Sequence, residues 1–331
     1  MEILIINGQQ VRELLPMAAC MDVMEDALKA LGRGDAQNPL RSFTWLPDKR
    51  GLLAAMPALT EEALGIKVIS VFPGNINTKY ESHMGAVMLF EATYGRPLAL
   101  IDASEVTAIR TAAVSGVATR LLAREDAHNL AILGTGVQAD VHLEAMMVAR
   151  DIRSVRAWSR TLENREKFAA RAKSRFGVTV ELTETAEDAV NGADIICTVT
   201  SAREPVLLGD WVMSGTHINA AGASTASSRE VDTSAMVKSR LFVDRRESTL
   251  NEAGDFLVPK QEGAVSDDHI RAELGEILLG EAAGRMSPDE ITLFKSLGLA
   301  VEDLASAQYI HQQALEKGIG TTVEFGATRH A

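Results

Sequence analysis

The chain has 331 residues, of which 46% are hydrophobic and 24% charged, a composition typical of globular proteins rather than disordered or fibrous ones. Its 33 basic and 45 acidic residues give a formal charge of −12, which disfavours nucleic acid and anionic membranes as partners. Cys20 and Cys197 lie far apart without His or Cys neighbours at ligand spacing, so neither a disulfide framework nor a zinc site is expected.

The length and the hydropathy pattern indicate a two-domain protein that stays in the cytoplasm. A single domain usually has roughly 100–200 residues, so a chain of 331 suggests two. No apolar stretch reaches the roughly 18 residues of a membrane-spanning helix. The apolar run at residues 1–6 has no basic segment before it, unlike a signal peptide.

Residues 1–125 show the pattern of an α+β domain. Apolar runs at residues 52–56, 66–72 and 86–90 predict strands, and a turn is expected at residues 72–75. Ser104 is typical of a helix start. In the helix that follows, Val106, Arg110, Val114 and Val117 share one face at helical spacing.

From residue 126 onward, short apolar runs alternate with amphipathic segments, as in a parallel sheet with crossover helices. A helix is expected over residues 164–176, ending at Gly177, and a final helix over residues 300–317 could pack on the first domain. We therefore predict an α/β fold with a doubly wound parallel sheet over residues 126–299. Strands are predicted at residues 130–133, 155–158, 178–180, 195–199, 218–221 and 241–243.

A dinucleotide-binding motif follows the first of these strands. The motif reads Gly134-Thr135-Gly136-Val137-Gln138-Ala139 and opens an amphipathic helix. Gly134 permits a tight turn, Gly136 lets the backbone approach a pyrophosphate, and Ala139 allows close packing of helix on sheet. The alternative is a glycine-rich turn that binds nothing, although the strand before it and the helix after it favour the Rossmann interpretation.

The end of the second strand bears on the choice of cofactor. An acidic residue there would bind the ribose 2′-hydroxyl of NAD, but this chain has Ser159, Arg160 and Thr161. Hydroxyl groups and a guanidinium suit a 2′-phosphate, so we expect NADP(H) in preference to NAD(H). Arg160 could instead be a solvated surface charge. Later in the chain, we expect Thr198, Thr200 and Ser296 to contact the cofactor.

Three basic residues are candidates for binding a substrate carboxylate. Arg110 lies in an apolar helical stripe, where a buried guanidinium needs an anion, either a substrate or a structural partner such as Asp102 or Glu105. Lys67 interrupts an apolar strand and could be an acid–base group or an outward-pointing surface lysine. Arg41 is a weaker candidate from the sequence alone, and His83 and His217 are more typical of structural histidines.

Over nearly its whole length the chain resembles the ornithine cyclodeaminase/mu-crystallin family. The resemblance implies a homodimer in which residues 1–125 with 300–331 form a substrate-binding and dimerisation domain, with a Rossmann domain at 126–299. It also implies that Arg41, Lys67 and Arg110 hold the substrate carboxylate. Five motifs in order carry the resemblance, at residues 65–68, 107–113, 134–139, 217–222 and 294–303.

One departure from the family pattern concerns the substrate. The cyclodeaminase branch has a catalytic aspartate where this chain has Ser224, and a second carboxylate expected near Met56 and Pro57 is absent because residues 52–55 are apolar. A site without these carboxylates would leave the second ammonium of ornithine unpaired. Ornithine is therefore a disfavoured substrate.

We accordingly predict an NAD(P)H-dependent reductase of small cyclic or open imino acids, such as pyrroline-2-carboxylate. Hydride would pass to the α-carbon, Lys67 and Arg110 would act on the substrate, and Ser224 would hydrogen-bond the nitrogen or a water, or simply form a turn. Three alternatives remain. They are ornithine cyclodeamination, an amino-acid dehydrogenase of the alanine dehydrogenase type, and a non-catalytic ligand-binding protein like mu-crystallin.

Overall fold

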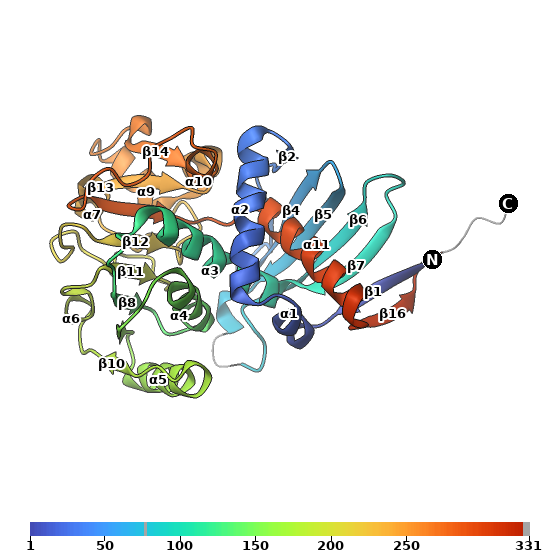
Figure 1. Ribbon diagram of the computed structural model, residues 1–331, viewed down its shortest axis with the longest axis horizontal. Helices are drawn as coiled ribbons and strands as arrows, with labels where there is room; N and C mark the ends of the chain where they lie inside the picture. Colours follow the sequence, from blue (N-terminus) through green and yellow to red (C-terminus); the bar gives the residue numbers. More distant parts are fainter. Residues whose placement is uncertain (76–77, 327–331) are drawn as a thin grey trace. The chain divides into compact units, whose positions relative to one another are not determined.

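The computed structural model describes residues 1–75 and 78–326, and the chain divides into two compact units (Figure 1). Unit 1 comprises Met1–Arg110 with Leu299–Ala331, and unit 2 comprises Thr111–Gly298. The chain first passes from unit 1 to unit 2 inside helix α3, Ala103–Leu122, whereas the sequence analysis placed this boundary after that helix. Among the described residues, every helix is too short or too polar to cross a lipid bilayer.

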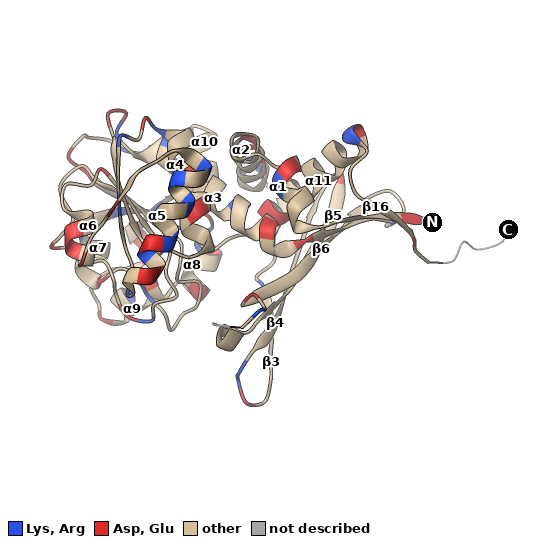
Figure 2. Ribbon diagram, turned by 90° about the horizontal axis from the view of Figure 1, so that it is seen from below, with Lys and Arg blue, Asp and Glu red and all other residues tan. Residues whose placement is uncertain are grey.

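Unit 1 is a mixed sheet with helices on one face. The sheet order is β16-β1-β7-β6-β5-β4-β2, and β3 pairs with β4. Figure 2 shows α1, α2 and α11 on one side of this sheet. The elements are β1 Glu2–Ile6, α1 Gly8–Leu14, α2 Met17–Arg33, β2 Ala36–Gln37, β3 Ser42–Trp45, β4 Leu52–Thr60, β5 Ala63–Val71, the 3-10 turn Pro73–Asn75, β6 His83–Glu91, β7 Pro97–Asp102, α11 Ala300–Lys317 and β16 Thr321–Glu324.

Side chains alternate between the two faces of this sheet, so buried and exposed residues alternate along its strands. In β4, Leu52, Ala54 and Met56 are buried on one face, whereas Leu53 and Leu59 on the opposite face are exposed. Leu304 of α11 packs against Gly65 of β5, where a side chain on the glycine would collide with it. The opposite face therefore presents apolar side chains that unit 1 itself leaves uncovered.

Unit 2 is a parallel sheet with the order β10-β9-β8-β11-β12-β15-β13-β14, which matches the predicted doubly wound fold. The strand order reverses between β8 and β11. The elements are β8 Asn129–Leu133, α4 Val137–Ala149, β9 Ser154–Trp158, α5 Leu162–Phe176, β10 Val180–Leu182, α6 Ala186–Val190, β11 Ile195–Thr198, β12 His217–Ala220, α7 Thr233–Lys238, β13 Ser239–Val243, α8 Arg246–Glu252, α9 Gly254–Gln261, the 3-10 turn Asp267–His269, β14 Ile270–Glu273, α10 Leu274–Leu278 and β15 Ile291–Lys295.

Most of the expected elements are present, with small shifts. Helix α5 ends at Gly177, whose φ of 72° is the left-handed conformation expected there, and α11 spans residues 300–317 as predicted. The strand expected at residues 178–180 is instead β10, Val180–Leu182, because the chain first turns away from the end of α5. Strands β14 and β15 were not predicted, although β15 is central to the sheet.

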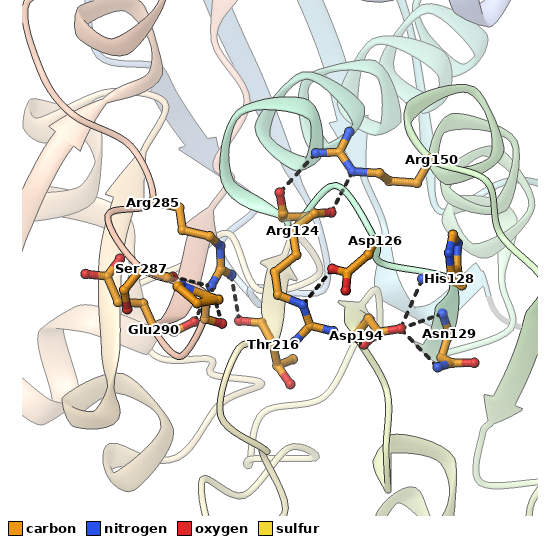
Figure 3. Close-up of polar contacts among 12 residues, drawn as sticks. Arg124, Asp126, His128, Asn129, Arg150, Asp194, Thr216, Arg285, Ser287 and Glu290 are labelled. Carbon is orange, nitrogen blue, oxygen red and sulfur yellow. Dashed lines mark hydrogen bonds and ion pairs between the residues drawn. The ribbon is translucent and has the colours of Figure 1, made fainter.

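The carboxyl end of α3 is held by arginines at the amino-terminal edge of the unit 2 sheet (Figure 3). Arg150 donates hydrogen bonds to the carbonyls of Arg120, Ala123 and Arg124, and Arg285 donates to the carbonyl of Leu122. Positive charge and donors at a helix carboxyl end stabilise its last turn. This cluster therefore has a structural role.

Candidate functional site

The loop after β8 has the backbone that a dinucleotide requires. Gly134 has a φ of 109°, and a Cβ there would lie 2.5 Å from the carbonyl oxygen of Val199, so only glycine fits. Ala139 is fully buried under the loop, and its amide donates to the carbonyl of Gly136. The turn is therefore tight and packs directly against the end of β11.

Gly136 differs from Gly134, because a Cβ there would meet no atom of the described residues within 4 Å. It is the N-cap of α4 and provides no side-chain cap, so the first amides of the helix point to a space that the protein leaves open. Such a helix start favours an anion, and a pyrophosphate fits this description. The carbonyl oxygen of the Gln138 side chain is also buried without a hydrogen-bond partner in the described part of the chain.

The expected nucleotide-selecting residues stand at the carboxyl end of β9. The Thr135 hydroxyl donates to the Ser159 hydroxyl at 2.9 Å, and the Ser159 hydroxyl in turn faces the carbonyl of Thr161. This chain links the end of β9 to the glycine loop. Arg160, between these two residues, is exposed. Its guanidinium is therefore accessible to a phosphate at this strand end.

Beyond β11 and β12 lies a buried carboxylate that the sequence analysis did not identify. Both carboxylate oxygens of Glu230 accept hydrogen bonds from the loops that follow these strands. The Thr198 hydroxyl donates at 2.9 Å, and the Thr200 amide and hydroxyl donate at 2.6 and 2.7 Å. The amides of Gly222 and Ala223 donate at 2.6 and 3.2 Å.

These contacts define where the expected cofactor residues of this region lie. Thr198 is fully buried and Thr200 is partly buried, with both hydroxyls directed to Glu230. Contact of either residue with a nucleotide stays a prediction. The hydroxyl of Ser296 is buried without a hydrogen-bond partner among the described residues, and an orphaned donor of this kind fits a ligand contact. Ser224, which follows Ala223, is exposed.

Glu230 is supported by a second buried carboxylate and a buried lysine. Asp255 accepts from the amides of Glu230 and Val231, and its other oxygen lies 2.9 Å from the Lys295 ammonium. Lys295 donates to the carbonyls of Ala220 and Ala223. Burial, and then Asp255, raise the pKa of Glu230, whereas Lys295 and the Thr200 donors act in the opposite direction.

In unit 1, Lys67 is a buried member of an ionic cluster. Its ammonium lies 2.7 Å from Asp303 on α11 and donates to the Thr107 hydroxyl at 3.2 Å. Burial lowers the pKa of Lys67 to about 8, an effect that Asp303 opposes and that the charges of Arg110 and Arg41 reinforce. The structure therefore excludes the outward-pointing surface lysine considered from the sequence.

Arg110 has structural partners that differ from those considered in the sequence analysis. Its Nε donates to Asp303 at 2.9 Å and its Nη1 to Glu302 at 3.0 Å. The candidates Asp102 and Glu105 are engaged elsewhere, since Asp102 accepts from the Glu105 amide and Glu105 pairs with Arg12. The separation along the chain hid the true partners, because α11 returns from the far end of the sequence.

Asp303 therefore bridges two buried cations. Burial raises the pKa of its carboxyl, but Arg110 and Lys67 outweigh this effect and hold the pKa below its ordinary value. Glu302 also accepts from the Leu299 amide, which fixes the start of α11. In the sequence this pair appears as two adjacent carboxylates at the end of the motif at residues 294–303 and in the first turn of the predicted helix, a place where acidic residues are common for other reasons.

The two candidate histidines are in different situations. His217 is buried, with ring nitrogens 3.0 Å from the Thr292 hydroxyl and 3.3 Å from Asn219, and burial lowers its pKa to about 3. It is therefore a neutral structural residue. The pKa of His83 is lowered, first by desolvation and then by the charge of Lys67, which places this imidazole in the electrostatic surroundings of the lysine.

The chain is similar to known proteins over nearly its whole length. The profile of the ornithine cyclodeaminase/mu-crystallin family matches residues 1–318. A Delta(1)-pyrroline-2-carboxylate reductase of Bacillus cereus is 39% identical over 325 residues, covering 97% of this chain and 100% of that protein. Ketimine reductase mu-crystallin of Mus musculus is 42% identical over 312 residues, covering 92% and 96% respectively. The solved structure of Thermococcus litoralis Delta(1)-pyrroline-2-carboxylate reductase in complex with NADH and L-proline has a TM-score of 0.95 and 39% identity, covering 97% of this chain and 100% of that one. The chain belongs to the ornithine cyclodeaminase/mu-crystallin family.

Proposed function

We propose that this protein reduces a small cyclic or open imino acid, such as pyrroline-2-carboxylate, to the corresponding amino acid with a reduced nicotinamide nucleotide. The observation that carries the proposal is the buried Lys67, held by Asp303 among the charges of Arg110 and Arg41. A cationic group with a pKa of about 8 can bind a carboxylate and can also exchange a proton near neutral pH. The reductase activity named for two relatives supports the same reaction.

The nucleotide would bind at the carboxyl ends of the unit 2 strands. Gly134, Thr135, Gly136, Val137, Gln138 and Ala139 would form the pyrophosphate loop, and Ser159, Arg160 and Thr161 the adenosine end. Thr200 and Ser296 would contact the rest of the molecule, while the buried Thr198 supports them. When bound, the reduced nucleotide supplies the hydride that adds to the α-carbon of the imine.

For the nucleotide, we propose a preference for NADPH over NADH. Arg160 is exposed at the end of β9, beside the hydroxyls of Ser159 and Thr161, and a guanidinium forms strong bonds with phosphate. A carboxylate at this place would favour the 2′-hydroxyl of NADH and repel the phosphate. A relative of known structure was solved in complex with NADH, so the affinities of this protein for NADPH and NADH are to be compared directly.

Lys67, Arg110 and Arg41 would hold the substrate carboxylate. Lys67 would also control the proton on the imine nitrogen. Below its pKa the Lys67 ammonium can donate a hydrogen bond to the substrate, or the proton that the imine nitrogen needs. Arg110 contributes its positive charge, while its Nε and Nη1 position Asp303 and Glu302. Reduction then balances as one hydride to carbon and one proton to nitrogen.

Ser224 provides a hydroxyl where the cyclodeaminase branch of the family has an aspartate. The neutral side chain is exposed in the loop after β12 and could hydrogen-bond a nitrogen or a water. It cannot balance the second ammonium of ornithine as a carboxylate would. This supports an imino acid over ornithine as substrate.

We also propose that the protein is a homodimer that uses the uncovered face of the unit 1 sheet. Leu53, Leu59 and Leu64 are exposed there, and a groove of about 260 Å³ is lined by Pro57, Leu59, Leu64, Ile66 and Phe90 among others. A contiguous apolar surface of this kind is characteristic of an interface. A second copy of the chain would cover it.

The reaction is tested by following oxidation of NADPH or NADH by purified protein with pyrroline-2-carboxylate or piperideine-2-carboxylate. We expect turnover that Lys67→Ala and Arg110→Ala abolish. Ammonia release from ornithine without net change in the nucleotide would show cyclodeamination. Activity only on 2-oxo acids with ammonia would show an amino-acid dehydrogenase. Nucleotide binding without any turnover would show a binding protein.

A further inference from the structure

The buried Glu230 connects the carboxyl ends of two neighbouring strands of unit 2, β11 and β12. A Cβ on Gly222 would lie 2.4 Å from the Glu230 carboxylate and 2.3 Å from the Thr200 carbonyl oxygen, so the loops after β11 and β12 meet around this side chain. The loop after β8 joins the same packing, because a Cβ on Gly134 would collide with Val199. One carboxylate therefore holds together the loops after β11 and β12, which lie on the other side of the strand-order reversal from the glycine loop.

Only a carboxylate can satisfy all the donors that surround it. One oxygen accepts from the Thr200 amide and hydroxyl, and the other accepts from the Thr198 hydroxyl and the amides of Gly222 and Ala223. A glutamine would turn its NH₂ group toward at least one backbone amide in either orientation. The hydroxyls could rotate to accept, but a backbone amide cannot, so a loop would have to move.

The burial of this charge is compensated by the neighbouring groups. Asp255 fixes the backbone on both sides of Glu230 by accepting from the amides of Glu230 and Val231. Lys295 supplies the positive charge, and its contacts with the carbonyls of Ala220 and Ala223 hold the other side of the same loop. A buried carboxylate without such support would be strongly destabilising.

We propose that Glu230, supported by Asp255 and Lys295, is a positioning residue that shapes the loops after β11 and β12 for the nicotinamide half of the nucleotide. In a doubly wound sheet, one half binds each mononucleotide, and the half with β8 and β9 carries the glycine loop and Arg160. The loops held by Glu230 belong to the other half. The inference rests on the proposed nucleotide binding. It identifies Glu230 as a residue that affects this binding without touching the nucleotide.

The test compares affinities for a whole nucleotide and for a fragment that lacks nicotinamide. Dissociation constants of NADPH and of 2′-phospho-ADP-ribose are measured by calorimetry with full-length wild-type protein and Glu230→Gln, together with thermal unfolding midpoints. NADH and ADP-ribose serve as the second pair. We expect Glu230→Gln to weaken the whole nucleotide about ten-fold or more and to change fragment binding by less than about two-fold.

Asp194→Asn provides the matched control. Asp194 also accepts from two backbone amides, those of His128 and Asn129, but it lies at the opposite, amino-terminal ends of β8 and β11 (Figure 3). We expect this variant to unfold at a lower temperature while the ratio of the two affinities stays at the wild-type value. General destabilisation of the sheet would therefore not mimic the expected result.

The outcomes distinguish failure of this inference from failure of the proposed function. Equal weakening of nucleotide and fragment by Glu230→Gln, or no weakening of either, would overturn the inference. If the wild-type protein bound neither ligand, the proposed function would fail instead. Should Glu230→Gln not fold, Asp255→Asn provides the second variant, for which the same selective loss is expected and an unchanged ratio would contradict the inference.

Discussion

Replacing Asp303 by asparagine should move the pH dependence of the reaction. The substitution removes the negative charge 2.7 Å from the Lys67 ammonium and leaves the positive charges of Arg110 and Arg41 in place. With a pKa of about 8, roughly nine in ten Lys67 side chains are protonated at about pH 7. Opposite charges whose centres are about 4 Å apart contribute about 4 kcal/mol at an effective dielectric constant near 20, equivalent to about a thousand-fold in the protonation equilibrium.

The sign of the effect follows from which form of Lys67 is active. If the ammonium serves the substrate, wild-type kcat/KM is constant below the folded pKa and falls as pH rises through about 8. In Asp303→Asn the same fall should occur below neutral pH. At about pH 7 we therefore expect kcat/KM to decrease between about ten- and a hundred-fold, with partial recovery in more acidic buffer.

The assay is the initial rate of nucleotide oxidation with pyrroline-2-carboxylate over a pH series, with unfolding midpoints measured alongside. Lys67 can lose its proton and so remove one of the buried positive charges that Asp303 no longer balances. The loss of stability should therefore stay below the roughly 3–5 kcal/mol of a broken buried ion pair. The control variant is Asp35→Asn, which removes a carboxylate paired with Arg33 at the surface of the same unit. It should change neither the pH dependence of kcat/KM nor the unfolding midpoint. If kcat/KM of Asp303→Asn fell over the same basic pH range as that of the wild type, the assigned role of Lys67 would be refuted.

Three further predictions concern the nucleotide and the sheet face. Gly136→Ala should fold as the wild type does, since the added Cβ would contact none of the residues that the structure describes. It should nevertheless weaken NADPH binding about ten-fold or more in a calorimetric titration, and wild-type affinity would show that no pyrophosphate approaches this residue. Arg160→Ala should raise the KM for NADPH about ten-fold and leave the KM for NADH within about two-fold, because only the 2′-phosphate contact is lost; equal effects on both would contradict the NADPH preference. Leu59→Glu on the exposed sheet face should convert a dimer to a monomer by light scattering, whereas Leu162→Glu, at an exposed apolar position of unit 2, should not.

The sequence allowed most of the fold to be predicted, because its local signals agree with the tertiary structure. The glycine loop, the stop at Gly177 and the span of α11 follow from local backbone requirements and periodicity. Strand β15 is not evident from the sequence because its apolar run is short and ends at Lys295, and only the folded sheet shows that this lysine is buried against Asp255. Periodicity alone cannot distinguish such a residue from a loop charge.

Outside the glycine loop and the end of β9, the site residues were predictable from the residues alone only where a residue contradicts its local surroundings. Lys67 in an apolar strand and Arg110 in an apolar helical stripe were conspicuous for that reason, and both are buried. Asp303 and Glu230 were not conspicuous, since one stands in the first turn of a helix and the other in a loop region, where carboxylates are ordinary. Their importance depends on donors contributed from distant parts of the chain.

An isotope label tests most directly whether hydride adds to the α-carbon of an imino acid. Purified protein is incubated with pyrroline-2-carboxylate and a reduced nucleotide that carries deuterium at the transferable position of nicotinamide, and the proline formed is analysed by mass spectrometry and NMR. We predict one deuterium at the α-carbon for each nucleotide oxidised, and none in reactions with Lys67→Ala. Unlabelled proline, or proline formed only from ornithine with release of ammonia, would contradict the proposed reaction.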